Sequence, residues 1–307
     1  MTRLRVHVPA TSANLGPGFD TLGIALSHGD ELTVSTRDAP GVSVMVNGVG
    51  AGEVPTDETN LVARSVRHVF DRLGRTMPGI DIVAHNRIPH GRGMGSSGSA
   101  IVAGVMIAAG LLAHDATDPV RLGDDQLLRF ATELEGHPDN VAPALFGGLT
   151  IAWTNAEGPR FKRLMVHRGV APLVLVPDFT MSTELARSLQ PAQVPHEDAV
   201  FNVSRSALLV AALTQSPELL FEATEDRLHQ NYRGEAMPLT RDLISALRAA
   251  GHAAVVSGAG PSILVLASGP AERLAAAKVA ETHGGSWRAL FLAVDIKGAT
   301  VEEIPAA

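Results

Sequence analysis

A stretch rich in glycine and serine carries the strongest chemical signal in this sequence. Residues 89–100 read Pro-His-Gly-Arg-Gly-Met-Gly-Ser-Ser-Gly-Ser-Ala, and the apolar run 101–113 follows directly. Glycines let backbone N–H groups approach a bulky anion because no Cβ stands in the way. The first turn of a helix adds unpaired N–H donors and the positive end of the helix dipole. The stretch therefore predicts a phosphate cradle at the start of a buried helix.

Two nucleotide-binding motifs and a plain turn are the alternatives for this cradle. Gly93-Met-Gly-Ser-Ser-Gly98 fits the GxGxxG pattern, but dinucleotide-binding folds also need a second strand that ends in an acid about 20 residues further on. Here Asp115 and Asp118 lie in a turn-like stretch with no strand before them. A Walker A loop needs Gly-Lys-Ser or Gly-Lys-Thr, and neither tripeptide occurs. A structural turn between a strand and a helix stays open as the alternative.

Two more glycine-rich segments flank the cradle along the chain. Residues 9–20 read Pro-Ala-Thr-Ser-Ala-Asn-Leu-Gly-Pro-Gly-Phe-Asp, and residues 255–263 read Val-Val-Ser-Gly-Ala-Gly-Pro-Ser-Ile. The first segment is either a substrate-facing loop, with Asn14 and Asp20 as its polar groups, or simply a loop. The second either brings its backbone close to a site or forms an ordinary hairpin turn.

Polar side chains also gather at residues 133–140, Glu-Leu-Glu-Gly-His-Pro-Asp-Asn, at the end of a predicted helix. Glu133 and Glu135 lie on different faces of that helix, so we do not expect them to chelate one ion together. One of them could reach a Mg²⁺ ion held against nucleotide phosphates, because Mg²⁺ takes one or two carboxylates plus phosphate oxygens. A solvated helix end is the alternative, and His137 could be a structural hydrogen-bond partner.

Composition limits the classes of protein and of partner. The chain has 307 residues, 45% of them hydrophobic and 19% charged, which is typical of a soluble globular protein. A net charge of −7 and the lack of a basic run argue against nucleic acid or an anionic membrane as the main partner. No cysteine is present, which excludes disulfides, zinc thiolate sites and thiol nucleophiles. The start of the chain does not read as a signal peptide, so we expect a cytoplasmic protein.

Hydrophobic periodicity predicts the elements that position these segments. The order in the second half, helix, two strands, helix and strand, fits an α+β sandwich with an antiparallel sheet on one side. A domain boundary is expected near residue 155. Strands are predicted at 4–8 (ending at Pro9), 31–35, 42–46, 80–84, 149–153, 172–176, 253–256, 263–267 and 287–294, and helices at 60–73, 124–134, 199–213, 239–250 and 272–283.

The three glycine-rich segments, in this order, resemble the GHMP family of small-molecule kinases over nearly the whole chain. Residues 89–100 are similar to that family's phosphate loop, and residues 257–262 to its C-terminal glycine motif. Within the family, residues 9–20 and His-Pro-Asp-Asn-Val-Ala-Pro-Ala at 137–144, with Gly-Gly shortly after, are similar to the members that phosphorylate homoserine. Two departures from the usual loop, Met94 for leucine and Gly98 for alanine, are small changes.

This resemblance implies a two-domain α+β fold and a reaction. Residues 1–155 would form an N-terminal ATP-binding, ribosomal-protein-S5-like domain, and residues 156–307 a C-terminal ferredoxin-like α/β sandwich. The implied reaction, a step of threonine biosynthesis, transfers a phosphoryl group from ATP, with Mg²⁺, to the hydroxyl of L-homoserine. A homodimer is also implied. Another kinase of the family, acting on mevalonate, shikimate or a sugar, and a non-catalytic binding protein of this fold are the rival readings.

The resemblance also assigns site residues. Adenine would lie beside Asn60, and Mg²⁺ would be held by Ser96 and Glu133. The ATP phosphates would lie on the cradle, comprising Pro89, His90, Gly91, Arg92, Gly93, Met94, Gly95, Ser96, Ser97, Gly98 and Ser99. The amino-acid site would comprise Asn14, Asp20, His137, Asn140, Thr183, Arg187 and Arg233.

The chemistry of homoserine agrees with these assignments. A zwitterion needs an acid for its ammonium group, which Asp20 can supply, and a planar fork for its carboxylate, which Arg187 or Arg233 can supply. Several relatives place an aspartate near the transfer point as a base, whereas this chain carries Asn140 there, and an amide cannot usefully accept a proton. We therefore expect in-line transfer without a dedicated base, with Asn140 and Arg187 as the catalytic residues and Asp139 as the competing candidate base.

Overall fold

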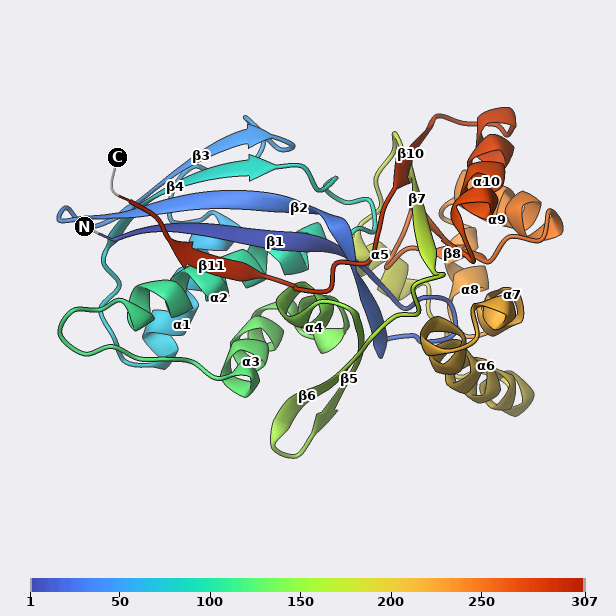
Figure 1. Cartoon of the computed structure of the whole chain (residues 1–307), viewed down its shortest axis with the longest axis horizontal. Coiled ribbons are helices and arrows are strands. Elements are labelled where there is room, and N and C mark those ends of the chain that lie inside the picture. Colours follow the sequence, from blue (N-terminus) through green and yellow to red (C-terminus); the bar gives the residue numbers. More distant parts are fainter. Residues whose placement is uncertain (1, 306–307) are drawn as a thin grey trace.

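Two β-sheets organise the chain, each covered by helices, as the ribbon in Figure 1 shows. The computed structural model describes residues 2–305. The first sheet and its helices occupy the left of that view, and the second sheet with its helices occupies the right. Both units mix strands with helices, so the predicted α+β class is confirmed.

The first sheet contains seven of the described strands, in the order β11-β1-β2-β4-β3, with β5 and β6 continuing from β2. Strand β2 is 16 residues long and pairs with β5 near its start and with β4 further along. Only β3 and β4 run parallel, while the other pairs are antiparallel. The bounds are β1 Arg3–Ala13, β2 Leu22–Arg37, β3 Val42–Gly48, β4 Gly79–Asn86, β5 Leu149–Asn155, β6 Gly158–Leu164 and β11 Thr300–Glu303.

Helix α2, Ser96–Ala113, is the centre of the first unit. It packs against β1 and three other helices, α1 Leu61–Arg72, α3 Asp124–Glu135 and α4 Pro138–Phe146. Because neighbours surround it, its sequence is apolar on nearly all sides rather than on one stripe. Within residues 2–305 it is the one helix long and apolar enough to cross a membrane, but 72% of it is buried inside the protein. Its apolarity is therefore explained by the core.

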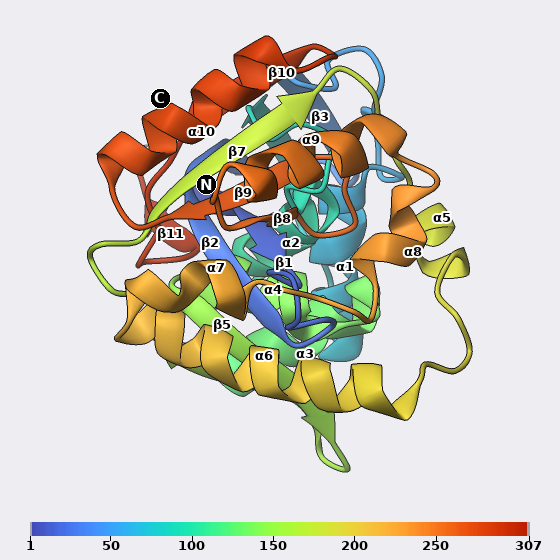
Figure 2. The ribbon, with the colours of Figure 1, turned by 90° about the vertical axis from the view of Figure 1, so that its right-hand side faces the viewer.

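The second sheet has four antiparallel strands in the order β10-β7-β9-β8. Helices α9 and α10 pack on one face through Leu243, Leu247 and Ala276. Helix α6 packs on the other side through Leu209 and Leu213, in a core shared with the first unit. Figure 2 looks onto these helices. The bounds are β7 Ala171–Pro177, β8 Ala254–Val256, β9 Ile263–Ala267, β10 Trp287–Phe291, α5 Thr183–Ser188, α6 His196–Thr214, η1 Pro217–Leu219, α7 Leu220–Ala223, α8 Gln230–Gly234, α9 Pro238–Ala249 and α10 Pro270–Thr282.

The predicted division of the chain at residue 155 needs correction. Asn155 ends β5, and β6 pairs back onto β5, so the expected boundary falls inside a hairpin of the first sheet. The chain leaves that sheet only after Leu164, and it returns at its end, where β11 pairs with β1 through Leu4 and Glu303. The residues near 155 do form a turn, but this turn closes the β5–β6 hairpin instead of linking two domains.

Strand β1 also differs from the prediction. It does not end at Pro9 but continues to Ala13, past a bulge between Pro9 and Ala10. Proline lacks an N–H donor and is tolerated at a bulge, where the regular ladder is interrupted anyway. The strand thereby carries the chain directly into the segment that holds Asn14.

Candidate active site

Two adjoining cavities share the start of α2 as a wall. One has a volume of about 220 Å³ and the other about 170 Å³, and both are lined by Ser96 and Ser97. The cradle expected from the sequence therefore stands between two binding spaces. Such a placement suits a phosphate group that is passed from a donor on one side to an acceptor on the other.

The backbone of the cradle depends on its glycines. Gly91, Gly93 and Gly95 have φ of 62°, 70° and 69°, which is the left-handed region that L side chains avoid. A Cβ on Gly93 would lie 2.2 Å from the carbonyl oxygen of Ser257, and one on Gly95 would lie 2.0 Å from Thr11 Oγ1. Helix α2 begins directly after Gly95. The first-turn N–H groups are thus free to face the cavities, which fits a phosphate tail.

The cradle residues divide into those that line a cavity and those that hold the loop. His90, Gly91, Gly93, Gly95, Ser96, Ser97 and Ser99 line one or both cavities. Pro89, Arg92, Met94 and Gly98 line neither. Arg92 donates to the carbonyl oxygens of Pro177 and Asp178 at 2.9 Å, and the Met94 side chain is fully buried. These residues tie the loop to the second sheet and to the core.

The larger cavity is lined mainly by apolar side chains, which suits an aromatic base. Asn60 lies on its wall, but its side chain is already used, because it caps α1 by accepting from Val62 N and donates to Pro55 O. Its backbone and its apolar neighbours are what face a ligand. The apolar lining residues are Leu32, Val44, Val46, Val54, Leu61, Val62, Ala84 and Ala103.

The smaller cavity brings together all seven residues expected for the amino-acid site, namely Asn14, Asp20, His137, Asn140, Thr183, Arg187 and Arg233. Asn14 organises one side of it with φ of 69°. Its amide donates to Gly258 O at 2.8 Å, and its oxygen accepts from Asp20 N at 2.9 Å. The side chain thereby joins the N-terminal segment to the turn between β8 and β9.

Asp20 and Arg187 neutralise each other across the cavity. The two guanidinium nitrogens of Arg187 lie 3.2 and 3.3 Å from the carboxylate oxygens of Asp20, in a bidentate pair. The side chains are 39% and 40% exposed, respectively. An exposed pair of this kind contributes little stability, so a zwitterion can displace it at low cost.

Arg233 differs because its charge is buried. The residue is 2% exposed, donates to Gly258 O at 3.2 Å, and has its guanidinium carbon 5.1 Å from the centre of the Phe19 ring. Burial lowers the pKa of Arg233, and the charge of Asp20 opposes that effect. No salt bridge joins it to an acid within residues 2–305. A buried cation without a paired anion is costly, so this site favours an anionic ligand group.

His137 and Asp139 form a close pair at the start of α4. Nδ1 of His137 lies 2.5 Å from Oδ1 of Asp139, which is 2% exposed. Burial pulls the pKa of His137 down, but the hydrogen bond to Asp139 and its charge outweigh burial and raise that pKa above its usual value. Asp139 is therefore engaged with a histidine in this arrangement.

Asn140 lies between the cradle and the smaller cavity. Its side-chain oxygen accepts from Thr11 Oγ1 at 2.9 Å, and the same oxygen lies close to Gly95. The oxygen keeps one further acceptor site and the amide nitrogen keeps its N–H donors, and neither group is basic enough to take a proton from an alcohol. This geometry agrees with the expectation that Asn140 does not act as a base.

The structure places Glu133, the acid expected for the metal site, away from both cavities. Glu133 lines neither cavity, and its carboxylate bonds to His68 at 2.8 Å and to Arg72 at 3.0 Å. Glu135 lines the smaller cavity and accepts from Ser97 Oγ at 3.1 Å. Residues two apart on a helix point in different directions, so α3 sends Glu133 toward α1 and Glu135 toward the cradle. Burial raises the pKa of Glu135, and His137 and Ser97 oppose that effect.

Glu135 and the serines satisfy what a nucleotide-bound Mg²⁺ ion requires. The structure contains no group of three His, Asp or Glu side chains within residues 2–305 that could hold a metal alone. An ion carried by ATP needs only one or two protein oxygens, because the phosphates supply others. The carboxylate of Glu135 beside the hydroxyls of Ser96 and Ser97 provides such a donor set.

The family assignment rests on two matching domain models. The model for the N-terminal domain of GHMP kinases matches residues 60–148, and the model for their C-terminal domain matches residues 207–284. The chain belongs to the GHMP kinase family. The predicted resemblance is confirmed, and with it the assignment of the protein as a kinase.

Curated relatives of this GHMP kinase are close. A protein of Clavibacter michiganensis subsp. michiganensis named homoserine kinase is 67% identical over 98% of this chain and 95% of its own length. A homoserine kinase of Leifsonia xyli subsp. xyli is 67% identical over 97% of this chain and 92% of its own length. A crystal structure of homoserine kinase from Cytophaga hutchinsonii has a TM-score of 0.86 and 29% identity, covering 98% of both chains.

Three contacts of the site of this GHMP kinase could not be predicted from the sequence. Thr11 donates to Asn140, Ser97 donates to Glu135, and Ser257 donates to Gly93 O at 2.6 Å. Thr11 lies in the segment predicted as a loop, but the structure places it in β1. Ser257 lies in the segment predicted as either a hairpin or a functional turn, and the structure shows a hairpin turn between β8 and β9 that contacts the cradle. Sequence spacing alone does not show which of the two acids on α3 faces the cradle, because that depends on which part of the fold each face of the helix contacts.

Proposed function

We propose that this kinase transfers the γ-phosphoryl group of ATP to the hydroxyl of L-homoserine, forming O-phospho-L-homoserine. The arrangement of Asp20 with Arg187 and Arg233 in the cavity that adjoins the cradle carries this proposal. Relatives named homoserine kinase at 67% identity support the same substrate. Threonine biosynthesis is the pathway that such a reaction serves.

The two ends of the substrate have distinct partners in this proposal. The substrate carboxylate pairs with the buried Arg233, which lacks an anion of its own. The ammonium group pairs with Asp20 and displaces Arg187 from that carboxylate. Released in this way, Arg187 faces the developing charge of the phosphoryl group. Thr183 and His137, on the same wall, orient the chain of the substrate.

ATP binds with its base in the slot beside Asn60 and its phosphates on the cradle. Ser96 and Glu135 hold the Mg²⁺ ion in our proposal, with Glu135 in place of the Glu133 expected from the sequence. The ion supplies charge neutralisation for the phosphates. The N–H groups of the first turn of α2 stay fixed while charge moves, so they contribute without reorganising.

The reaction proceeds without a dedicated side-chain base. Asn140 cannot accept the hydroxyl proton usefully, and Asp139 is engaged with His137 at 2.5 Å. Phosphoryl transfer has a loose transition state in most analyses, so positioning and charge stabilisation can carry most of the catalysis. The hydroxyl proton then passes to a phosphate oxygen late in the step. Asp139 is the competing base, if it leaves His137 when substrate binds.

A coupled ADP-release assay with several alcohols tests the proposal. L-Homoserine is compared with L-threonine, L-serine, shikimate and mevalonate, each with ATP and Mg²⁺. We expect the highest kcat/KM with L-homoserine, because shikimate and mevalonate leave Asp20 without an ammonium partner. A higher value with mevalonate or shikimate would contradict the proposed substrate. The homodimer and the cytoplasmic location expected from the sequence are also proposals, and light scattering after size-exclusion chromatography tests the first.

A further inference from the structure

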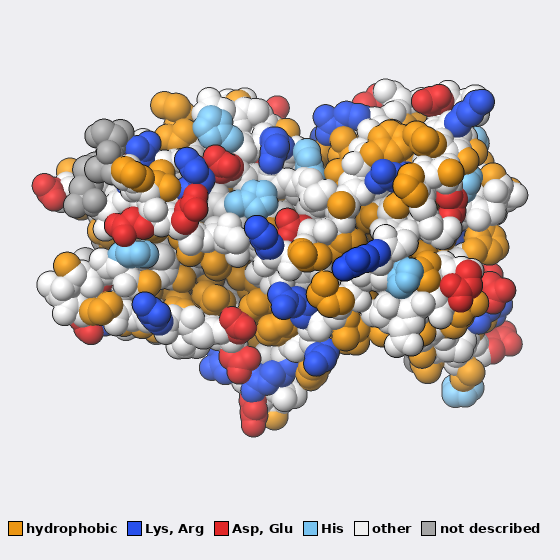
Figure 3. Space-filling model, in the orientation of Figure 1, with side chains coloured by type: hydrophobic (Ala, Val, Ile, Leu, Met, Phe, Trp, Pro, Cys, Tyr) orange, Lys and Arg blue, Asp and Glu red, His pale blue; other side chains and the backbone are white. Residues whose placement is uncertain are grey.

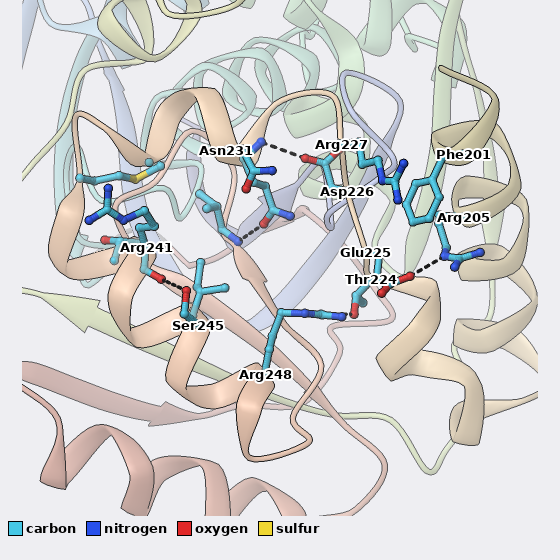
Figure 4. A pocket seen from close by; sticks show the side chains of 16 residues that line it. Phe201, Arg205, Thr224, Glu225, Asp226, Arg227, Asn231, Arg241, Ser245 and Arg248 are labelled. Atoms are coloured by element: carbon cyan, nitrogen blue, oxygen red, sulfur yellow. Dashed lines mark hydrogen bonds and ion pairs between the residues drawn. The ribbon is translucent and has the colours of Figure 1, made fainter. Parts of the chain in front are cut away.

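A third cavity, of about 440 Å³, lies on the far side of α8 from the candidate active site, and Figure 4 shows it from close by. Its walls come from α6, α8, α9, β8 and the segment before α8. None of its lining residues lines either cavity of the active site. Its volume falls within the range of about 300–1,000 Å³ that small-molecule sites occupy. It is therefore a separate space of adequate size for a ligand.

Arg248 is the distinctive charged group of this cavity. Its guanidinium donates to Thr224 Oγ1 at 3.0 Å and to Phe221 O at 2.9 Å, and lies 4.6 Å from the centre of the Phe221 ring. Figure 4 shows the side chain reaching across toward Thr224. No salt bridge joins Arg248 to an acid in the part of the chain that the structure describes. Neutral oxygens and a ring contact its guanidinium, and the nearest acid, Glu225, acts on it only through its charge, without an ion pair.

The same arrangement occurs at Arg233. There too a guanidinium is held by a carbonyl oxygen and an aromatic ring, without a salt bridge. Burial lowers the pKa of both arginines. Arg233 faces the candidate substrate site, where an anionic group is expected. Arg248 is half-buried rather than fully buried, but it lines a cavity and has no ion-pair partner, so it is a second place where an anionic group can pair with a guanidinium.

The other charges of the cavity are already engaged. Arg205 pairs with Glu225 at 2.8 Å, and Arg241 pairs with Asp242 at 2.9 Å. The carboxylate of Asp226 accepts from three successive backbone N–H groups that begin at Leu228. Neither acid that lines the cavity is thus free for Arg248. The apolar part of the wall is formed by Met237, Ile244 and Val256.

We propose that this cavity binds a small organic acid, whose carboxylate pairs with Arg248 and whose apolar body packs on Met237, Ile244 and Val256. The carboxylate supplies the anion that no side chain of the described chain provides. The apolar wall distinguishes such an acid from a bare inorganic anion. This proposal does not depend on the substrate proposed for the kinase, because the two spaces share no lining residue.

A titration with 4-fluorophenylacetate, followed by ¹⁹F NMR, tests the proposal. The active site is first filled with ADP and L-homoserine, so that binding there does not interfere. Ser245 lines the cavity one helical turn before Arg248. Ser245→Glu therefore places a competing carboxylate beside the guanidinium. Ala249→Glu adds the same charge to the same helix at an exposed residue outside the cavity and serves as the matched control.

We expect the wild type and Ala249→Glu to bind the probe with equal affinity. Ser245→Glu and Arg248→Gln should weaken binding by about tenfold to a hundredfold, the range for a charge-assisted hydrogen bond. Equal binding by Ser245→Glu, or no binding by the wild type, would overturn the proposal. Ser245 is exposed, so we expect Ser245→Glu to fold. This variant therefore still tests the proposal if Arg248→Gln does not fold. Displacement of the probe by an equal concentration of inorganic phosphate would overturn the assignment to an organic acid.

Discussion

At the scale of single residues, burial decides what each charge of the active site can do. Asp20 and Arg187 form a half-exposed pair that solvent also stabilises, so a substrate can exchange with it. Arg233 is buried and unpaired with an acid, so a ligand anion gains more there than in water. The two arginines expected to share one role therefore have different ones.

Arg233→Gln should raise the KM for L-homoserine by about tenfold to a hundredfold, because one charge-assisted contact is lost. The KM for ATP should change little, since Arg233 lines only the smaller of the two cavities. Steady-state kinetics with each substrate varied in turn measures both constants, and a thermal melt checks that the variant folds. An equal rise in both KM values would argue against a carboxylate contact.

The two acids at the end of α3 offer a matched pair. Glu135→Gln should shift the Mg²⁺ titration of activity to higher concentrations, because this carboxylate lies at the cradle. Glu133→Gln should leave the titration unchanged, since its contacts to His68 and Arg72 are structural. Activity measured against Mg²⁺ at fixed ATP distinguishes them. The reverse pattern would restore the acid expected from the sequence.

The pair of His137 and Asp139 makes stability depend on pH. The folded-state pKa of His137 is raised above its usual 6.5. Its contribution is therefore fully present below about pH 6.5 and is lost as pH rises through the folded-state value. The free energy of unfolding should favour the wild type over His137→Gln by more at pH 5.5 than at pH 9. Urea denaturation of both proteins at each pH measures the difference, and a constant difference would show that the pair does not titrate.

At the scale of elements, sequence patterns were reliable where a contact is local. The helix at 60–73, with Asn60 before it, is confirmed as α1, because side-chain capping and apolar spacing act within a few residues. The apolar run after the cradle is confirmed as α2. Helix α4 was missed because it is short and contains Pro143. The continuation of β1 past Pro9 was missed because a bulge depends on the partner strand.

Adding one methyl group at Gly93 tests whether the cradle packs against the turn between β8 and β9. Gly93→Ala would place its Cβ against Ser257 O, in a backbone conformation with φ of 70°. Gly52→Ala meets a similar φ of 78° with open space around it, so it is the control for backbone strain alone. Strain alone costs about 1–2 kcal/mol. Gly93→Ala should lower the melting temperature more than the control and weaken ATP binding, as calorimetry can measure. Equal effects would show that the turn does not pack on the cradle.

At the scale of the whole molecule, the site depends on contacts between distant parts of the chain. Strand β1 pairs with β11 across almost the full length of the sequence, and Asn14 reaches Gly258. No local pattern predicts such pairings, which is why the expected boundary at 155 was wrong. The structure nevertheless brings the residues expected for the amino-acid site to one cavity, although they come from distant parts of the chain. Positive and negative side chains are interspersed over the face in Figure 3, so no large patch of one charge dominates this face.

The position of α8 connects the proposed organic-acid cavity to the active site. One side of this short helix presents Arg233 to the smaller cavity of the active site, and the other presents Asn231 and Gly234 to the organic-acid cavity. Gln230 accepts from Val256 N at 2.7 Å, which fastens the helix to β8. We therefore expect a ligand that packs on this wall to shift α8 and, with it, the position of the Arg233 side chain.

We expect 4-fluorophenylacetate to change the KM for L-homoserine and to leave the KM for ATP nearly constant, because only the substrate side shares the α8 wall. Kinetics at several probe concentrations, with the wild type and Ser245→Glu compared, measure the effect. The Ser245→Glu variant should lose it, while Ala249→Glu should keep it. Coupling is reciprocal, so L-homoserine should alter probe affinity by the same factor. A probe that binds the wild type but leaves the KM for L-homoserine unchanged would show that α8 transmits nothing between the two cavities.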